Sequence, residues 1–146
     1  LYDEALKRRK NFYDALYHKA VCNYYLKRYD NSISDATKHI ELRPDIMQAY
    51  VIRAQANVAK QNYDPALADL DLVEQNRPDL MEYRLRGQIH SAKNGFEKAA
   101  QDFEKYIAAN TDKKGRVNVD AIVGFLDLGT ALDELKQSDK AVDAYS

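Results

Sequence analysis

Apolar residues recur at intervals of three and four in paired segments along the whole chain. This spacing is typical of amphipathic helices, so each pair of segments predicts a helix, a short turn and a second helix. The expected helices cover 13–27 and 30–42, 46–60 and 64–76, 80–93 and 96–109, and 119–136 with 139 onward. Asp45, Asp64 and Asp79 stand where they could cap the helices that follow them. The chain is therefore expected to be all-α.

The paired segments are copies of one unit. Arg43-Pro44-Asp45 recurs as Arg77-Pro78-Asp79 after 34 residues. Small residues occupy matching places in the first and second helices, which lets two helices approach to the low end of the ~8–10 Å range. We call these positions the small slots. They are Ala20, Ala54, Gly87 and Gly129 in the first helices, and Ser32, Ala66, Ala99 and Ala141 in the second.

The spacing of these small residues and of the large apolar residues around them resembles the tetratricopeptide repeat. The signature of that repeat is W-x2-L-G-x2-Y, then A-x3-F, then P. Phe125-Leu126-Asp127-Leu128-Gly129 is similar to the opening, Ala99-x3-Phe103 to the middle, and Pro44 and Pro78 to the close. The resemblance implies a right-handed superhelical solenoid of antiparallel helix-turn-helix repeats. Solenoids of this kind use their concave surface for binding.

The expected organisation is a single domain or fragment spanning 1–146, whose last repeat is truncated. Its parts are a partial N-terminal helix (1–12), repeat 1 (13–45), repeat 2 (46–79), repeat 3 (80–110), an inserted polar loop (111–118) and truncated repeat 4 (119–146). Residues 1–12 either come from an earlier unit or extend the helix that follows. Because solenoids need polar capping elements and none is visible, the natural chain is expected to continue.

Charge and composition narrow the function. The chain carries 22 Lys and Arg against 23 Asp and Glu, a formal charge of −1, which gives no electrostatic footprint for nucleic acid. The longest apolar run is far shorter than the ~18–20 residues of a spanning helix, so no membrane insertion is expected. One cysteine, Cys22, cannot form an internal disulfide. The absence of an internal disulfide slightly favours a cytoplasmic location, but it does not determine the compartment.

The sequence contains few candidates for catalytic or metal-binding residues. His18 and Cys22 are four residues apart on one helix, but a closed metal site takes four ligands and no second pair exists. His39 and His90 fall in helix-packing slots. No nucleotide-binding or hydrolase motif occurs. A dense group of carboxylates is expected to form a solvated acidic face: Asp64, Asp69, Asp71 and Glu74. We therefore expect no metal, no cofactor and no enzyme activity.

The remaining candidate is the concave groove, which the first helices would line. Tyr supplies apolar area with a polar tip and Arg is enriched at interface hot spots, so the groove suits a peptide or helix of a partner protein. Tyr24 and Tyr25 could instead pack against the neighbouring helix. The expected groove residues are Tyr17, Val21, Tyr24, Tyr25, Val51, Gln55, Arg84, Gln88, Leu126 and Thr130.

Some tetratricopeptide proteins hold the C-terminal carboxylates of heat-shock chaperones with Lys and Asn on successive first helices. The resemblance places Tyr17, Val21 and Ile52 at such positions here, so a chaperone-tail ligand is disfavoured. Two other roles stay open. The repeats could be an accessory region of a larger enzyme or transport assembly, or the solenoid could self-associate through its unshielded ends.

Overall fold

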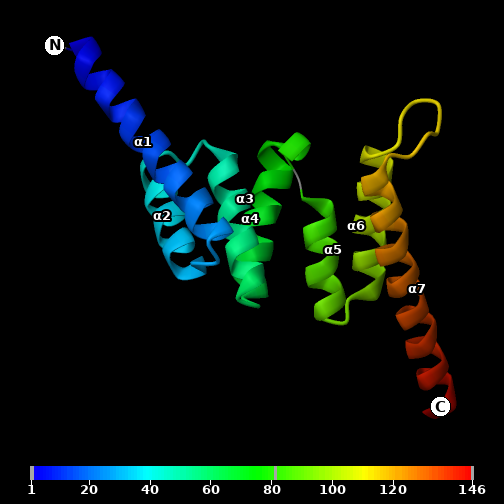
Figure 1. The fold of residues 1–146 in the computed structure, drawn as a ribbon. Helices are drawn as coiled ribbons and strands as arrows, with labels where there is room; N and C mark the ends of the chain where they lie inside the picture. The colour runs from blue at the N-terminus through cyan, green and yellow to red at the C-terminus, as the bar shows by residue number, and fades with distance from the viewer. Residues whose placement is uncertain (1, 81, 146) are drawn as a thin grey trace. The chain divides into compact units, whose positions relative to one another are not determined.

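The computed structural model describes residues 2–80 and 82–145, with side chains for residue 4 and for 7–9, 11–79 and 82–137. Within these ranges the chain is all-α as predicted, and its one β feature is an isolated bridge between Thr111 and Val117. Figure 1 shows the helices in chain order. They are α1 (Tyr2–Tyr25), α2 (Tyr29–Leu42), α3 (Met47–Ala59), α4 (Tyr63–Asn76), the 3₁₀ helix Pro78–Leu80, α5 (Tyr83–Ala92), α6 (Phe96–Ala109) and α7 (Val119–Tyr145).

The helices gather into two compact units, Leu1–Met81 and Glu82–Ser146. In the first unit α1 packs on α2, α2 on α3 and α3 on α4, and α1 also contacts α3. In the second unit α5 packs on α6, α6 on α7, and α5 also contacts α7. The division falls close to the predicted boundary between repeats 2 and 3.

One turn geometry joins the helices of each hairpin. Lys27, Gln61 and Asn94 have positive φ angles of 58°, 61° and 57°, and each stands seven residues after the small slot of its first helix. The N–H of the next residue donates to a carbonyl five residues back, which is the Schellman arrangement that ends helices. These bonds are Arg28 to Asn23 (2.8 Å), Asn62 to Asn57 (2.9 Å) and Gly95 to His90 (2.8 Å). The first three hairpins therefore share the same backbone conformation at their turns.

The small slots make the predicted close contacts between helices. Ala20, Ala54, Ala66 and Ala99 are fully buried. The hydroxyl of Ser32 on α2 donates to the carbonyl of Ala20 on α1 at 2.8 Å. These contacts confirm that small residues set the approach of the paired helices.

Gly87 packs directly under an aromatic ring of the next helix. A Cβ at Gly87 would lie 2.6 Å from Cε1 of Phe103, a distance that only the absence of a side chain allows.

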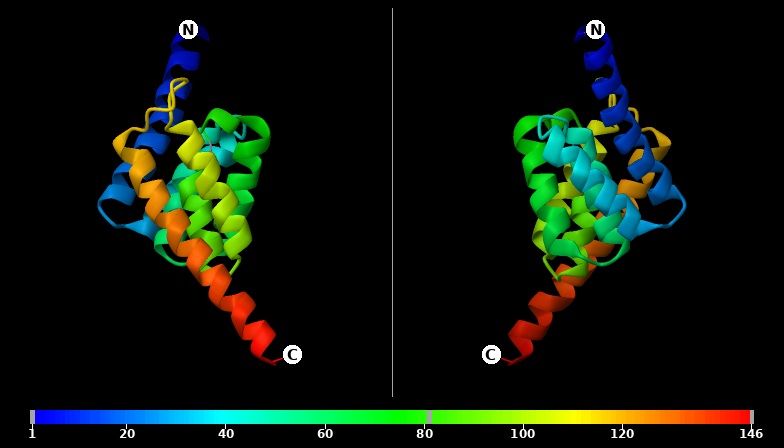
Figure 2. Two further views of the ribbon diagram at one scale, coloured as in Figure 1. Left: turned by 90° about the vertical axis from the view of Figure 1, so that its right-hand side faces the viewer. Right: turned by 90° about the vertical axis from the view of Figure 1, so that its left-hand side faces the viewer.

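The N-terminal segment extends the helix that follows it. α1 runs without interruption from Tyr2 to Tyr25, so residues 2–12 are not a separate helix. In Figures 1 and 2 the first turns of α1 run beyond the neighbouring helices of the first unit. Of the two alternatives left open by the sequence, this is the second.

The C-terminal segment differs from the prediction. Two helices, 119–136 and 139 onward, were expected, but α7 is one helix from Val119 to Tyr145. Lys136 occupies the place where the other turns have positive φ, yet it lies within the helix. The aromatic that opens the other second helices is replaced by Ser138, so the chain lacks the apolar contact that follows the turn.

The described side chains include no close contact at Gly129. A Cβ at Gly129 would meet nothing within 4 Å, whereas a Cβ at Gly124 would lie 2.8 Å from atoms of both Tyr106 and Ile107. Gly124 is thus the close contact of α7 with α6. The residue expected to lie opposite Gly129 is Ala141, whose side chain lies outside the described residues.

The three predicted aspartate caps are wrong. No side-chain cap bonds form at the starts of α3 and α4, and α4 begins at Tyr63, before Asp64. Asp45 and Asp79 each accept two hydrogen bonds from the arginine two residues earlier, at 2.7–3.0 Å. The repeated Arg-Pro-Asp motif therefore makes a local ion pair. The inserted loop does supply a cap, because Oδ1 of Asn118 accepts from the N–H of Ala121 at 2.9 Å.

Candidate functional site

Six of the ten predicted groove residues lie in the first unit, on α1 and α3. We call this surface the α1–α3 face: Tyr17, Val21, Tyr24 and Tyr25 from α1, with Val51 and Gln55 from α3. The two helices contact each other directly. Tyr17, Val21 and Tyr24 pack against a buried cluster of Ala20, Ala36 and Ile52. A rigid core thus supports the inner edge of this face.

The two adjacent tyrosines have different roles. Tyr24 is half-buried and its ring lies 5.9 Å from that of Tyr29 at the start of α2. The ring of Tyr25 stands edge-on to Tyr24, with centroids 5.4 Å apart at 73°, and is 76% exposed. Packing therefore accounts for Tyr24, whereas Tyr25 presents most of its ring to solvent.

The α1–α3 face carries no formal charge, because all six residues that define it are uncharged at neutral pH. Ile52, one of the positions compared with the carboxylate clamp, belongs to the buried cluster and has no access to a ligand. Val51 and Gln55 are half-buried beside it. The six residues offer aromatic and aliphatic area with one amide, and none of the six is a cation.

The other four predicted groove residues lie in the second unit. Arg84 on α5 donates through Nε to Oδ2 of Asp127 on α7 at 2.6 Å, so its charge is balanced within the unit. The hydroxyl of Thr130 donates to the carbonyl of Leu126 at 3.0 Å. Leu126 and Gln88 are exposed. Six of the ten residues thus belong to the first unit and four to the second.

A repeated ion pair was missed by the sequence reasoning. In each of the first three hairpins a cation on the first helix bonds to an Asp sixteen residues later on the second. The pairs are Lys19–Asp35 (3.2 Å), Arg53–Asp69 (2.7 and 2.8 Å) and Arg86–Asp102 (2.8 and 2.9 Å). The cation precedes the small slot of its helix by one residue. Because the cation always stands one residue before the small slot, this spacing could have been used to predict the ion pairs from the sequence.

Asp69 corrects the expected acidic face. It was placed with Asp64, Asp71 and Glu74 on the solvent side, but it is 3% exposed and bonds Arg53 at both oxygens. Asp64 and Asp71 are exposed as expected. Burying a carboxylate requires a paired charge, and Arg53 supplies it.

The two packing histidines lie where the sequence placed them, His39 buried and His90 half-buried. The ring of His39 lies 6.0 Å from that of Tyr17, and its buried Nδ1 has no hydrogen-bond partner. Burial lowers the pKa of His39, with a smaller lowering from Arg43 against opposing effects of Asp14 and Asp45. His39 is therefore a neutral core residue at neutral pH.

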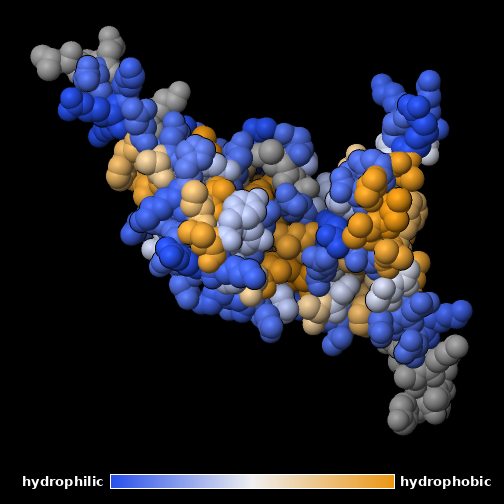
Figure 3. All heavy atoms as spheres, viewed as in Figure 1, coloured by the Kyte–Doolittle hydropathy of each residue, from blue (hydrophilic) through white to orange (hydrophobic). Residues whose placement is uncertain are grey.

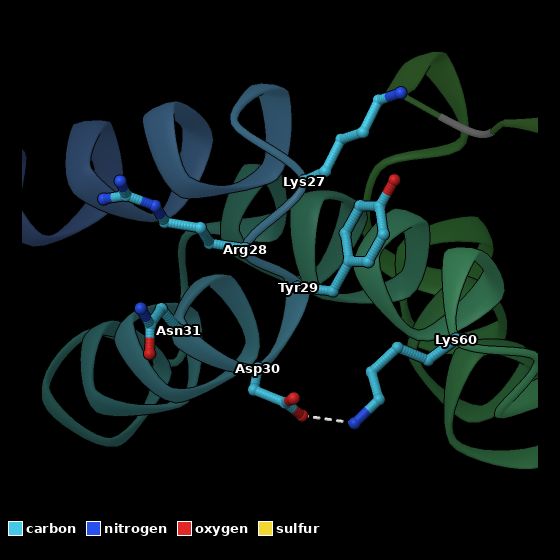
Figure 4. A pocket seen from close by; sticks show the side chains of 6 residues that line it. All are labelled: Lys27, Arg28, Tyr29, Asp30, Asn31 and Lys60. Carbon is cyan, nitrogen blue, oxygen red and sulfur yellow. Dashed lines mark hydrogen bonds and ion pairs between the residues drawn. The ribbon is translucent and has the colours of Figure 1, made fainter.

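A shallow hollow beside the α1–α2 turn is lined mainly by charged and polar groups. Figure 4 shows Lys27, Arg28, Tyr29, Asp30 and Lys60 around it, together with Asn31. Asp30 is paired with Lys60, and the head groups of Lys27 and Arg28 point in different directions. The cations do not converge on a point, so this hollow lacks the geometry of an anion clamp.

The described residues also bear on metal binding and membrane insertion. Within the described ranges no three His, Cys, Asp or Glu side chains come together to hold a metal ion. His18 and Cys22 are both exposed on α1. In the part of the chain that the structure describes, no helix has the length and apolarity needed to cross a membrane.

The sequence was compared with known proteins. No family model matches it. Over 62 residues the chain is 40% identical to serine/threonine-protein phosphatase T of Aspergillus oryzae, a match covering 42% of this chain and 13% of that protein. Over 96 residues it is 26% identical to a DnaJ homolog subfamily C member 7 homolog of Dictyostelium discoideum, covering 65% and 17%. The matched regions are thus small parts of both relatives.

Solved structures show the same fold. The Sgt2 TPR domain from Aspergillus fumigatus superimposes with a TM-score of 0.73 at 20% identity, covering 88% of this chain and 82% of that one. The first TPR domain of Spaghetti (RPAP3), bound to the HSP90 peptide SRMEEVD, gives a TM-score of 0.70 at 21% identity, covering 83% and 93%.

Proposed function

Because the chain has the tetratricopeptide-repeat fold, we propose that it is a protein-interaction module that binds an apolar or aromatic segment of a partner on the α1–α3 face. The observation that carries the proposal is the composition of this face. It has exposed and half-buried aromatic and aliphatic side chains on a packed core and no formal charge. The proposal includes no catalytic role and no cofactor.

The exposed ring of Tyr25 supports the proposal that a partner protein covers this face. Tyrosine immobilises little side-chain freedom and buries a large area, which is why it dominates many interfaces. Val21 and Val51 add aliphatic surface, and the side-chain amide of Gln55 offers an NH2 group that donates and a carbonyl oxygen that accepts, which can orient a backbone. Such a set fits a short helix or extended segment with apolar anchors.

The ligand class differs from that of the structural neighbour. The first TPR domain of Spaghetti (RPAP3) binds the acidic peptide SRMEEVD. An acidic tail needs cationic or amide donors for its carboxylates, whereas the compared positions here hold Tyr17, Val21 and buried Ile52. We therefore propose an uncharged or apolar ligand segment in place of an acidic C-terminus.

The module is also proposed to serve a larger polypeptide or assembly. The observation that favours this is the size of the relatives, because the aligned parts cover 13% and 17% of their lengths. Whatever catalytic activity such a polypeptide has would then reside outside these repeats. Identifying the residues that flank this chain in its gene tests the suggestion, and a flanking catalytic or assembly domain is the expected result.

Selection from a displayed library of random peptides tests the binding proposal. We expect enrichment of peptides with spaced aromatic and aliphatic anchors. Val51→Lys puts a charge on the α1–α3 face and should weaken the selected peptides at least about tenfold, or about 1.4 kcal/mol. Gln75→Lys adds the same charge at an exposed position on α4 and should have no effect. Equal binding to both variants would remove the proposed site.

A further inference from the structure

One apolar side of α7 is exposed to solvent. Five large apolar residues of this helix are exposed: Val119 at 77%, Ile122 at 53%, Phe125 at 50%, Leu126 at 68% and Leu132 at 46%. Figure 3 shows hydrophobic surface gathered along this helix. Ile122, Phe125, Gly129 and Leu132 recur at intervals of three and four, so they share one side of the helix. We call these four residues the α7 apolar face.

The α7 apolar face is distinct from the side of α7 that packs within the unit. Leu128 and Ala131 lie against Ala99 and Phe103 of α6, and a Cβ at Gly124 would meet α6 as well. α7 is therefore apolar on a second side in addition to the one that α6 covers. A helix that is apolar on more than one side normally has more than one neighbour.

The corresponding side of α3 shows what kind of neighbour fits. The α3 residues at the same distances from the small slot as Phe125, Gly129 and Leu132 are Tyr50, Ala54 and Asn57. All three are buried, and the helix that packs on α3 in the same hairpin is α4. An antiparallel helix is thus what covers these positions elsewhere in the chain.

The α7 apolar face is complementary to itself when two copies of α7 run antiparallel. If Phe125 of one copy lies opposite Gly129 of the other, Ile122 lies opposite Leu132, because both pairs are centred on position 127. The two-fold axis repeats both contacts, so each glycine receives a ring. Within the second unit the ring of Phe103 packs on Gly87 in the same way. Large residues that face small ones fill an interface without voids.

A parallel pair does not have this fit. It would place Gly129 opposite Gly129 and Phe125 opposite Phe125, which leaves a void at one level and crowds two rings at the other. Asn118 and Lys136 continue the face beyond its two ends, and both are polar and exposed. The complementary stretch is therefore 119–132, all of whose side chains the structure describes.

The area is enough for a weak dimer. The five exposed apolar residues present on the order of 500 Å² in one copy, so a pair of copies buries about 1,000 Å², which is the lower limit expected of a specific interface. The four residues of the face carry no charge, so bringing two copies together places no like charges opposite each other within it.

We propose that two copies of this chain associate through the α7 apolar face, with their α7 helices antiparallel and the two-fold axis at the level of residue 127. Such an interface is isologous, because the same residues are contributed by both copies. The dimer uses α7, whereas the ligand proposed above uses α1 and α3, so either proposal can fail without the other.

Sedimentation velocity over roughly 1–500 µM tests the association, because the dimer fraction must rise with concentration by mass action. Gly129→Leu occupies the space that the Phe125 ring of the other copy needs. It causes no clash in the single chain, since nothing lies within 4 Å of a Cβ at that position. This variant should sediment as a monomer throughout the range.

Glu134→Leu is the matched control, because it adds the same side chain at an exposed position on another side of α7. It should associate like the unaltered chain. An unaltered chain that stays monomeric over the whole range would overturn the proposal. Equal association of Gly129→Leu and Glu134→Leu would overturn it as well.

Cysteine pairing tests the antiparallel register. Ile122→Cys is introduced in one chain and Leu132→Cys in another, each with Cys22→Ser. Disulfides need Cα separations of about 4.4–6.8 Å, which facing residues of two packed helices can reach, so oxidising the mixture should give mainly the mixed disulfide. Either chain alone should give far less, because identical positions are then about 15 Å apart along the helices. Disulfides formed as readily by either chain alone would refute the register.

Discussion

Arg86 of α5 and Asp102 of α6 form a two-point ion pair in which guanidinium Nε and Nη2 lie 2.9 and 2.8 Å from the two carboxylate oxygens. The side chains are 9% and 5% exposed, so the pair is buried between the two helices of one hairpin. Arg53 and Asp69 repeat the arrangement between α3 and α4. The pair fixes the register of each hairpin at the same place.

Asp102→Ala should destabilise the chain strongly, because it removes both carboxylate bonds to a buried guanidinium. Removing one member of a buried pair costs about 3–5 kcal/mol. Urea unfolding followed by circular dichroism measures the change. Asp79→Ala removes the partner of Arg77 at an exposed site and should change the unfolding free energy far less.

The double variant Arg86→Met with Asp102→Leu separates the cost of removing the Asp102 carboxylate alone from the value of the whole ion pair. Well-packed apolar replacements of buried pairs are often neutral or stabilising. We expect the double variant to be more stable than Asp102→Ala. Equal stability of Asp102→Ala and Asp79→Ala would show that the Arg86–Asp102 pair does not hold the hairpin.

Gly87→Ala and Gly129→Ala should have opposite effects. The added Cβ at Gly87 meets Phe103 at 2.6 Å, and overpacking of this kind costs about 1–3 kcal/mol. At Gly129 it meets nothing within 4 Å, and alanine gains about 1 kcal/mol of helix propensity. Thermal unfolding measures both. A stabilising Gly87→Ala would contradict the close packing of α5 on α6.

His39 should make stability fall on mild acidification. Burial lowers its pKa in the folded chain below the ordinary 6.5, so the unfolded chain binds a proton more readily. The free energy of unfolding is therefore greatest above pH 6.5 and decreases as the pH falls below that value. His39→Leu removes this contribution, and urea titrations between about pH 5 and 8 compare the two proteins. An unchanged slope in the variant would exclude His39 as its source.

The peptide SRMEEVD should not bind in the way it binds to the first TPR domain of Spaghetti (RPAP3). Tyr17, Val21 and buried Ile52 supply no pair of donors for a terminal carboxylate. We expect a Kd of about 1 mM or weaker by calorimetry. Micromolar binding that is lost when the peptide carries a C-terminal amide would contradict the uncharged ligand class.

Local spacing in the sequence was enough to predict most of the helical hairpins. Ala20, Ala54 and Gly87 mark the contacts between helices because only small residues fit there, and a period of 34 residues makes them visible. The end of α7 was not predictable from the same slots. Gly129 and Ala141 have the spacing of a hairpin, but helix continuation at Lys136 depends on the contacts that a turn gains or loses.

The sequence was enough to predict which positions of the first helices form the candidate site. It was not enough to predict which of these side chains are buried or already paired. Periodicity placed Tyr17, Val21 and Tyr24 on one side of a helix, whereas their shared support by Ile52 is a tertiary contact. The charge of Arg84 looked available in the sequence. Its partner Asp127 is 43 residues away on α7, and a pair at that separation has no local signal.

Binding at the α1–α3 face is tested most directly by mapping amide chemical shifts of the isotopically labelled chain as a peptide from the library selection is added. The largest changes should fall on α1 and α3 around Tyr17, Val21, Val51 and Gln55, and Val51→Lys should abolish them at equal peptide concentration. Changes confined to α2, α4 or the second unit, with none on α1 and α3, would contradict the assignment.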